Sequence, residues 1–281
     1  MKSNKWKFLL TGAATLTLLT ACTQASSQSA TKSNTAQTTA TSTSKNKTNN
    51  SNYFTDKDKD SSYDESKAST VKLSGSSASV SGDGVAVSGS TVTISKPGTY
   101  VISGESDGVQ IKVEAGDSDD VHIVLKGVTM TNTNAPISAT KAGHVYLTLA
   151  DGTINTLSDS SSNNDEDADA VIFSKGDLTI NGSGTLNIDA KKNNGIKAND
   201  TLHITGGTYK ITAVGDAFNV NDELNITGTT MTIDADEDAV KVDNDEDTSV
   251  GTMYLSDNKM TITAGDDGIH ASGDLIIDSG T

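Results

Sequence analysis

The 281-residue chain contains no arginine, one cysteine, two prolines and one tryptophan. Without guanidinium groups, it has no side chain that can clamp a carboxylate or phosphate bidentately. A single cysteine excludes an internal disulfide, and therefore any disulfide-stapled scaffold. The apolar share is 33%, below the ~45–50% of ordinary globular domains. This shortage excludes a thick central core but allows a thin core that is repeated along the chain.

Basic residues are also scarce. Acidic residues outnumber basic ones by 37 to 21, and the formal net charge is −16. A nucleic-acid partner is held largely through its phosphates, which requires the opposite charge. We therefore expect no nucleic-acid partner.

The N-terminus carries the pattern of an export signal. Lysines precede a mostly apolar run over residues 8–21, which is shorter than the ~20 residues of a membrane-spanning helix. The run ends in Leu19-Thr-Ala-Cys22. This sequence resembles the bacterial lipobox, in which the cysteine receives several acyl chains, palmitate among them, and becomes the new N-terminus. We predict a lipoprotein signal peptide over residues 1–21 and lipid anchoring of Cys22 at the extracytoplasmic face of a bacterial cell membrane.

Residues 22–67 consist mainly of Ser, Thr, Asn, Gln and Lys. Because such a segment cannot bury enough apolar surface to fold, we predict a disordered linker behind the lipidated cysteine. Residues 68–281 form the predicted folded domain. The chain stops inside a repeat at Thr281, so we expect either that it is truncated there or that the exposed last coil promotes self-association.

A unit of about 22 residues recurs from residue 169 onward and holds three alternating segments. The equivalent apolar residues of the first segment in successive repeats are Val171, Ile196, Phe218, Val240 and Ile269. Those of the second segment are Leu178, Leu202, Leu224, Met253 and Leu275. Those of the third segment are Leu186, Tyr209, Met231 and Met260. Alternation places the apolar residues on one face of a strand. We therefore predict an all-β fold, a right-handed parallel β-helix with three short strands per coil. A β-sandwich has turns at similar spacing, but it does not require the same residue types at the same places.

The repeat concentrates acidic residues at one turn, between the third strand of one coil and the first strand of the next. That turn carries Asn194, Asp216, Asp238 and Asp267. Stacked coils would bring neighbours in this column to ~5 Å. Two carboxylates at that distance repel each other by about 3 kcal/mol at an effective dielectric constant of ~20. The column therefore needs compensating positive charge.

Three further runs follow the pattern Asp-x-Asp-x-Asp, and a fourth cluster pairs two adjacent aspartates. Clustered carboxylates suit calcium, which takes about six to eight oxygen ligands. Zinc and copper are disfavoured because the four histidines are scattered. A solvated loop is the alternative for any single acidic run. We predict that several Ca²⁺ ions bind among Asp165, Asp167, Asp169, Asp216, Asp234, Asp236, Asp238, Asp243, Asp245, Asp247, Asp266 and Asp267.

Several stretches also carry a resemblance to known proteins. They are Pro97-Gly-Thr-Tyr-Val-Ile-Ser-Gly104, Leu149-Ala-Asp-Gly-Thr-Ile-Asn155, the segment from Ala170 to Leu186, Asn194-Gly-Ile196 and Gly265-Asp-Asp-Gly-Ile269. Over residues 90–281 the chain resembles a bacterial family of carbohydrate-binding, calcium-binding parallel β-helix lipoproteins with a pectate-lyase-like fold. The resemblance implies binding of plant cell-wall polysaccharides, cellulose and pectin-type chains. It also implies calcium at Asp216, Asp238, Asp266 and Asp267, whereas Asn194 departs from the expected acid.

The resemblance favours a non-catalytic, calcium-loaded protein that binds acidic or other cell-wall polysaccharide and touches the membrane through its lipid anchor only. A calcium-dependent polysaccharide lyase is the enzyme alternative, but it needs a base that is neutral near physiological pH. Arginine is absent, and the acidic neighbours of Lys241 stabilise its charged form. We therefore predict no catalytic residues. A structural surface scaffold or adhesin is the third possibility.

Aromatic platforms for stacking on sugar rings are few in the predicted domain. Its tyrosines are Tyr100, Tyr146, Tyr209 and Tyr254. Tyr209 stands at a core-facing position of its strand, and Phe173 and Phe218 lie in first-strand segments that we expect to pack inward. Binding of a neutral crystalline glucan through stacked aromatic rings is therefore poorly supported.

Overall fold

The computed structural model describes residues 52–247 and 249–281. The predicted signal peptide, Cys22 and most of the predicted linker lie outside the described residues. The described residues all belong to one compact unit. It is all-β apart from one short helix, α1 (Asp56–Lys59). Across the described ranges, no helix is both long and apolar enough to cross a membrane.

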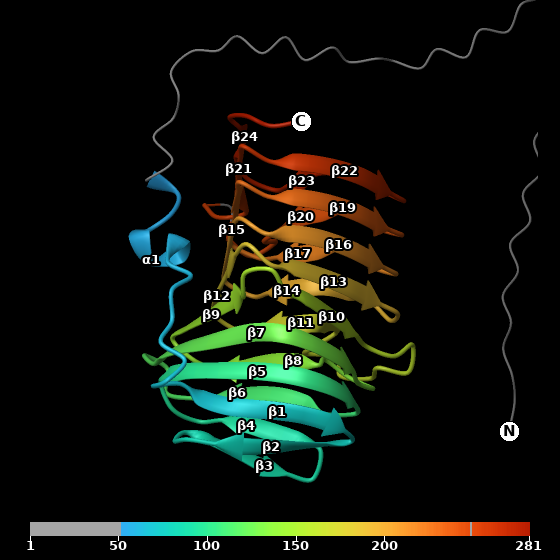
Figure 1. Ribbon diagram of the computed structural model, residues 1–281. Coiled ribbons are helices and arrows are strands. Elements are labelled where there is room, and N and C mark those ends of the chain that lie inside the picture. Colours follow the sequence, from blue (N-terminus) through green and yellow to red (C-terminus); the bar gives the residue numbers. More distant parts are fainter. Residues whose placement is uncertain (1–51, 248) are drawn as a thin grey trace, which may run out of the picture. The chain divides into compact units, whose positions relative to one another are not determined.

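The larger sheet contains 15 strands. It begins with β1 (Ser69–Gly75), β2 (Ser77–Ser81), β5 (Gly98–Asp107) and β7 (Asp120–Thr131). From β7, one arm continues through β9 (His144–Leu149), β12 (Asp177–Gly182), β15 (Thr201–Thr205), β18 (Glu223–Thr227), β21 (Thr252–Ser256) and β24 (Leu275–Ile277). The other arm continues through β10 (Ile154–Ser158), β13 (Thr185–Ala190), β16 (Thr208–Ala213), β19 (Thr230–Ala235) and β22 (Lys259–Ala264). Figure 1 shows these strands stacked one above another.

The second sheet contains nine strands. They are β3 (Val85–Ser88), β4 (Thr91–Ile94), β6 (Gln110–Glu114), β8 (Ile137–Lys141), β11 (Ala170–Ser174), β14 (Asn194–Ala198), β17 (Phe218–Val220), β20 (Val240–Val242) and β23 (His270–Ala271). Antiparallel pairing occurs at its β3–β4 end and between β1 and β2 of the first sheet. The other strand pairs among the described residues are parallel. Together the two sheets confirm an all-β fold with parallel strands in large sheets. The right-handed coil stays a prediction.

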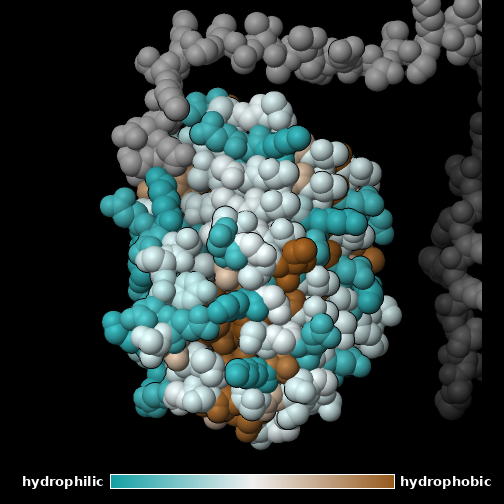
Figure 2. Space-filling model, viewed as in Figure 1, coloured by the Kyte–Doolittle hydropathy of each residue, from teal (hydrophilic) through white to brown (hydrophobic). Residues whose placement is uncertain are grey.

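Parallel pairing sets equivalent residues of successive repeats side by side. Leu178 pairs with Leu202, and Leu202 pairs in turn with Leu224. In β16 and β19 the buried and exposed residues alternate strictly. The buried residues of successive strands join into one continuous apolar core that includes Tyr209 and Phe218, as predicted. In Figure 2 the visible face is mostly neutral or hydrophilic, with small apolar patches.

The first repeat is offset by one residue from its predicted alignment. Val171 was predicted to match Ile196, but Ile172 is the residue that pairs with Ile196. Both Val171 and Ile172 are buried, so the apolar pattern alone fits either register. Because of the offset, Asp169 does not stack in the column that contains Asn194.

Residues 52–67, here named the strap, depart from the predicted linker. The segment packs along the outer face of β9, β12, β15, β18 and β21, and α1 lies within it (Figure 1). Thr55 and Asp58 form a capping box at the start of α1, which satisfies backbone N–H groups at the helix end. Phe54 and Asp58 are buried. The linker prediction was wrong for these residues because local capping and two buried side chains hold a polar segment in place.

A buried asparagine in β10 links the two neighbouring strands, β7 and β13. Asn155 is fully buried. Its Oδ1 accepts the Gly127 and Val128 N–H groups at 3.1 and 3.0 Å, and its Nδ2 donates to the Thr185 carbonyl at 3.2 Å. One side chain therefore satisfies backbone groups on both neighbouring segments.

Replacing Asn155 with alanine is expected to lower the free energy of unfolding by at least about 2 kcal/mol, because several buried backbone groups lose their partner. Urea denaturation measures this change. Asn187→Ala is the matched control, since Asn187 is only half-buried and makes one bond of 3.4 Å to Thr156. An equal loss in both variants would contradict the role given to Asn155.

Candidate functional site

The predicted column of turn residues is present, and it is joined by hydrogen bonds. The N–H of Asp216 donates to Asn194 Oδ1 at 3.1 Å, that of Asp238 to Asp216 Oδ1 at 2.9 Å, and that of Asp267 to Asp238 Oδ1 at 2.8 Å. Each side chain thus accepts the N–H of the next residue in the column. An asparagine serves at the first place because its amide oxygen accepts the same bond. Asn194, which stands where the resemblance leads one to expect an acid, therefore takes part in the hydrogen bonds of the column.

Lys241 supplies positive charge beside the column. Its Nζ lies 3.9 Å from Asp216 Oδ2 and 3.7 Å from Asp238 Oδ2. Asn219 also donates to Asp216 Oδ2 at 2.6 Å. Both aspartates are buried, so pairing with an ammonium and amide offsets part of their desolvation. Asp216 is therefore satisfied by protein groups.

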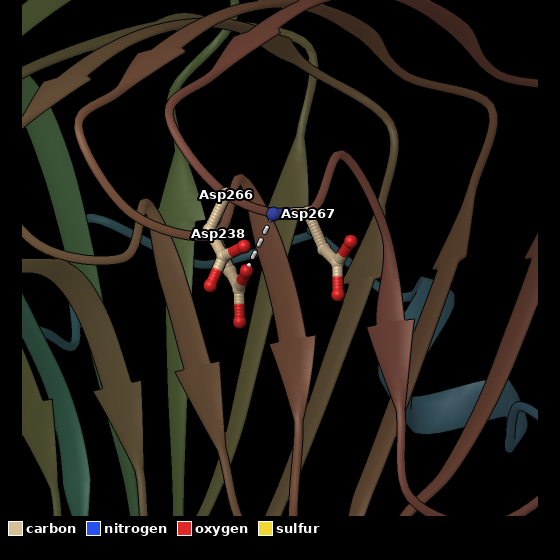
Figure 3. A group of neighbouring side chains, drawn as sticks. All are labelled: Asp238, Asp266 and Asp267. Carbon is tan, nitrogen blue, oxygen red and sulfur yellow. Dashed lines mark hydrogen bonds between the residues drawn. The ribbon is translucent and has the colours of Figure 1, made fainter. Parts of the chain in front are cut away.

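Three carboxylates gather at the far end of the column. The ligand atoms of Asp238, Asp266 and Asp267 lie within 4.8 Å of one another, and Figure 3 shows the three side chains at neighbouring turns. Asp266 and Asp267 are exposed, whereas Asp238 is buried. Apart from His270 Nδ1, 3.4 Å from Asp267 Oδ2, no basic group pairs with the two exposed acids among the described residues. We name these three residues the acid triad.

The spacing and chemistry of the triad are compatible with a calcium ion. Calcium–oxygen bonds of about 2.3–2.6 Å allow two ligands of one ion to lie up to roughly 5 Å apart, and the triad lies within that limit. Carboxylate oxygens are the ligands that this hard cation prefers. Three protein ligands would leave coordination positions open to water or to a bound partner.

The structure does not gather the other predicted metal ligands in the same way. Asp234 points outward from β19, and Asp236 is exposed beside it. Asp169 pairs with Lys197 at 2.7 Å. Among the described residues, the acid triad is the group of three or more candidate ligands whose atoms lie within 4.8 Å. Calcium at Asp165, Asp167, Asp169, Asp216, Asp234, Asp236, Asp243, Asp245 and Asp247 stays a prediction.

Two of the acidic loops use carboxylates to hold their own turns. Asp165 Oδ1 accepts the Ala168 N–H at 3.1 Å. Asp247 Oδ1 accepts the Ser249 N–H at 2.9 Å and the Ser249 hydroxyl at 2.6 Å, and these bonds lower the pKa of Asp247. Such local bonds stabilise turns without any ligand.

A second polar cluster lies beneath the strap. The Asp58 carboxylate accepts the Thr179 hydroxyl at 2.7 Å and lies 3.2 Å from His203 Nδ1. His203 Nε2 lies 3.3 Å from Glu223. Burial lowers the pKa of His203, but the neighbouring Asp58 and Glu223 carboxylates more than reverse this and raise it to about 9. Burial likewise opposes ionisation of Asp58, but bonds from His203 and Thr179 outweigh it and lower its pKa.

Comparisons with known proteins show which family the chain belongs to. A family model described as carbohydrate-binding domain-containing protein matches residues 88–281. This is most of the chain. The chain belongs to the family of carbohydrate-binding domain-containing proteins.

One relative from this family and one solved structure show the extent of the likeness. A carbohydrate-binding domain-containing protein of Acetivibrio thermocellus is 41% identical over 126 residues, which are 43% of this chain and 44% of that protein. The alignment thus spans less than half of the relative. The solved structure is described as a gadolinium derivative of the polysaccharide lyase-like protein from C. thermocellum. It is 30% identical, covers 75% of this chain and 96% of its own, and has a TM-score of 0.69.

Sequence reasoning missed the cluster beneath the strap. The four histidines looked scattered along the sequence, but the parallel register brings His122, His144 and His203 onto one sheet face. The strap itself gave two signals. One is the pair Tyr53-Phe54 in a segment otherwise poor in aromatic residues, and the other is the capping pattern Thr55-x-x-Asp58.

Attachment of the strap through Asp58 and His203 is expected to depend on pH. Because its pKa is raised in the folded protein, protonated His203 stabilises the attached strap fully below about pH 6.5. This stabilisation is lost as the pH rises through about 9. Because its pKa is lowered in the folded protein, ionised Asp58 stabilises the attached strap above about pH 4. This stabilisation is lost as the pH falls further. The charged groups around His203 are Asp58 on the strap, Glu223 on β18 and, when protonated, His144 on β9.

A double-mutant cycle with Asp58→Asn and His203→Gln measures the interaction between these two side chains as a function of pH. We expect a coupling free energy of about 1–3 kcal/mol at pH 6 that falls toward zero by pH 10. The same cycle on the exposed pair Asp267 and His270 provides the control, with a coupling of about 0.5 kcal/mol or less at both pH values. A coupling between Asp58 and His203 that is unchanged at pH 10 would contradict the assignment.

Proposed function

We propose that this protein is a non-catalytic, calcium-dependent binder of acidic, pectin-type polysaccharide, anchored through Cys22 at the outer face of a bacterial cell membrane. The observation that carries the proposal is the acid triad, three carboxylates within 4.8 Å with two of them exposed. Membership of a carbohydrate-binding family supports the polysaccharide as the partner.

Calcium connects these two observations. A cation held by Asp238, Asp266 and Asp267 leaves coordination positions that the carboxylate of a uronate can fill. The lysines near the column cannot play this part, because Lys241 is already paired with Asp216 and Asp238. The ion would therefore offset most of the local negative charge and offer its open coordination positions to an acidic polymer.

The similar solved structure is described as a gadolinium derivative, so crystals of that protein take up a hard cation. Gadolinium is a hard trivalent cation, so oxygen ligands bind it as they bind calcium. The lipid anchor rests on the sequence Leu19-Thr-Ala-Cys22.

Lyase chemistry is the second candidate, and the polysaccharide lyase-like neighbour is the observation that favours it. Proton abstraction beside a calcium-bound uronate needs a base near the triad. Lys241 is already paired with two carboxylates, at 3.9 Å from Asp216 and 3.7 Å from Asp238. His270 is the other titratable group there, at 3.4 Å from Asp267. With no arginine and no free lysine beside the triad in the described ranges, binding without cleavage is the better-supported proposal.

Retention on a polygalacturonate gel tests the proposal. We expect the chain from residue 23 onward to be retarded with calcium and to migrate freely with a chelator. The double variant Asp266→Asn/Asp267→Asn should lose at least about tenfold in affinity for the gel, because two charged ligands of the ion become neutral. Asp189→Asn is the matched control, since Asp189 is exposed on β13 outside the triad.

Two results would contradict the proposal. Retardation that is equal with calcium and with chelator would show that no ion is needed. Release of unsaturated sugars from polygalacturonate, followed by their ultraviolet absorbance, would assign the protein to the lyases instead.

A further inference from the structure

The strap covers a straight file of side chains on the outer face of the larger sheet. Successive parallel pairings place six residues at the same register, one on each strand: His122, Tyr146, Thr179, His203, Asn225 and Tyr254. We name these residues the outer file. At about 4.8 Å per strand, five steps span roughly 24 Å. The file therefore combines two tyrosine rings with imidazole, hydroxyl and amide groups over the length of several sugar rings.

These residues are polar or aromatic, yet several are as inaccessible as the core. The exposed fractions are 0% for Thr179 and 1% for Asn225 and Tyr254. The neighbouring Asn181 is also fully buried. Their side chains point away from the apolar interior, because the adjacent Leu178 and Ile180 face it. The strap is therefore what removes this face from water.

The strap contacts the file at one end through an aromatic ring. Tyr53 stacks on Tyr254 with ring centroids 3.7 Å apart and planes 5° from parallel. The Phe54 ring contacts the His203 ring edge-on, with ring centroids 5.5 Å apart. Flat stacking on an exposed tyrosine is also the usual way in which an aromatic platform receives the apolar face of a ring-shaped ligand.

The middle of the file receives a carboxylate. Asp58 is bound by Thr179 and His203, as described above. Around it, donors of the sheet reach carbonyl groups of the strap: Asn225 donates to Tyr53 at 3.0 Å, and Asn181 donates to Asp58 and Asp60 at 3.2 and 3.1 Å. The strap thus presents a ring, a carboxylate and several acceptor oxygens to one row of donors. A chain of uronic acids presents comparable groups: rings with an apolar face, carboxylates and acceptor oxygens.

Contact is looser at the other end. Lys57 pairs with Asp120 and lies 4.4 Å from the centre of the Tyr146 ring. The ring centroids of Tyr63 and His122 are 6.5 Å apart, farther than those of Tyr53 and Tyr254. A cleft of about 260 Å³ remains there, lined by residues that include Asp120, His122 and Tyr146. The file is therefore open to a ligand at this end even while the strap is in place.

We propose that the outer file is a second polysaccharide-binding site, specific for acidic sugar chains, and that the strap occupies it as an internal mimic of that ligand. Thr179 and His203 bind the uronate carboxylate in place of Asp58, Tyr254 stacks on a sugar ring in place of Tyr53, and Asn225 donates to a sugar oxygen. This inference rests on the proposed function for the class of ligand, but it concerns a face separate from the acid triad and requires no calcium.

A strap that can be cut after folding tests this site. A site-specific protease sequence is inserted after Ser66, in an exposed turn, and binding of oligogalacturonate is measured by calorimetry in chelator before and after the cut. We expect at least a tenfold rise in affinity after the cut. His203→Gln should remove the gain, whereas Asp189→Asn, on an exposed residue of β13 outside the file and the triad, should keep it. A synthetic peptide of residues 52–66 should compete with the sugar, and its Asp58→Asn form should compete less well.

The outcomes separate this inference from the proposed function. Equal affinity before and after the cut overturns the second site, as does a gain that His203→Gln leaves intact. If the same uncut chain still binds polygalacturonate with calcium, the proposed function stands. Loss of calcium-dependent binding together with a gain on cutting would support the outer file and overturn the triad. Circular dichroism before and after the cut shows whether the solenoid is retained.

Discussion

Parallel pairing of equivalent residues governs this structure. Each side chain lies about 4.8 Å from the side chain at the same place in the next repeat, so any residue type that recurs is multiplied into a row. Inside, rows of leucine and isoleucine form the thin core that a chain with few apolar residues can supply. At the turns the same rule stacks acids, and on the outer face of one sheet it aligns tyrosines, histidines and asparagines.

Rows of like charge are unfavourable, and the molecule offsets them in two ways. In the column, each carboxylate accepts the backbone N–H of the next repeat, and Lys241 lies between Asp216 and Asp238. This compensation does not reach Asp266 and Asp267, which are exposed at the end of the column. On the sheet face, Asp58 of the strap supplies the negative partner for His203. On the sheet face the strap supplies the missing charge, whereas at the end of the column the proposed calcium ion would supply it.

The sequence predicts the repeated parts well because their pattern recurs. Alternation located the strands and placed Tyr209 in the core, and the shared turn position identified the column of Asn194, Asp216, Asp238 and Asp267. The predicted strand register was wrong where two adjacent residues are equally apolar and both buried, as Val171 and Ile172 are. It also failed for the strap, since average composition conceals Phe54 and Asp58, whose burial depends on residues over a hundred positions away.

Thermal unfolding of the chain from residue 23 onward, in calcium, in magnesium and in chelator, tests most directly whether the acid triad is a cation site. An ion at about 100 times its dissociation constant adds about 2.7 kcal/mol to the free energy of unfolding for each site. We expect a higher midpoint in calcium than in magnesium or chelator, and no calcium-dependent rise when Asp266 and Asp267 are both asparagine. The same midpoint in all three solutions would show that these acids are only solvated, and that calcium does not connect this fold to its polysaccharide.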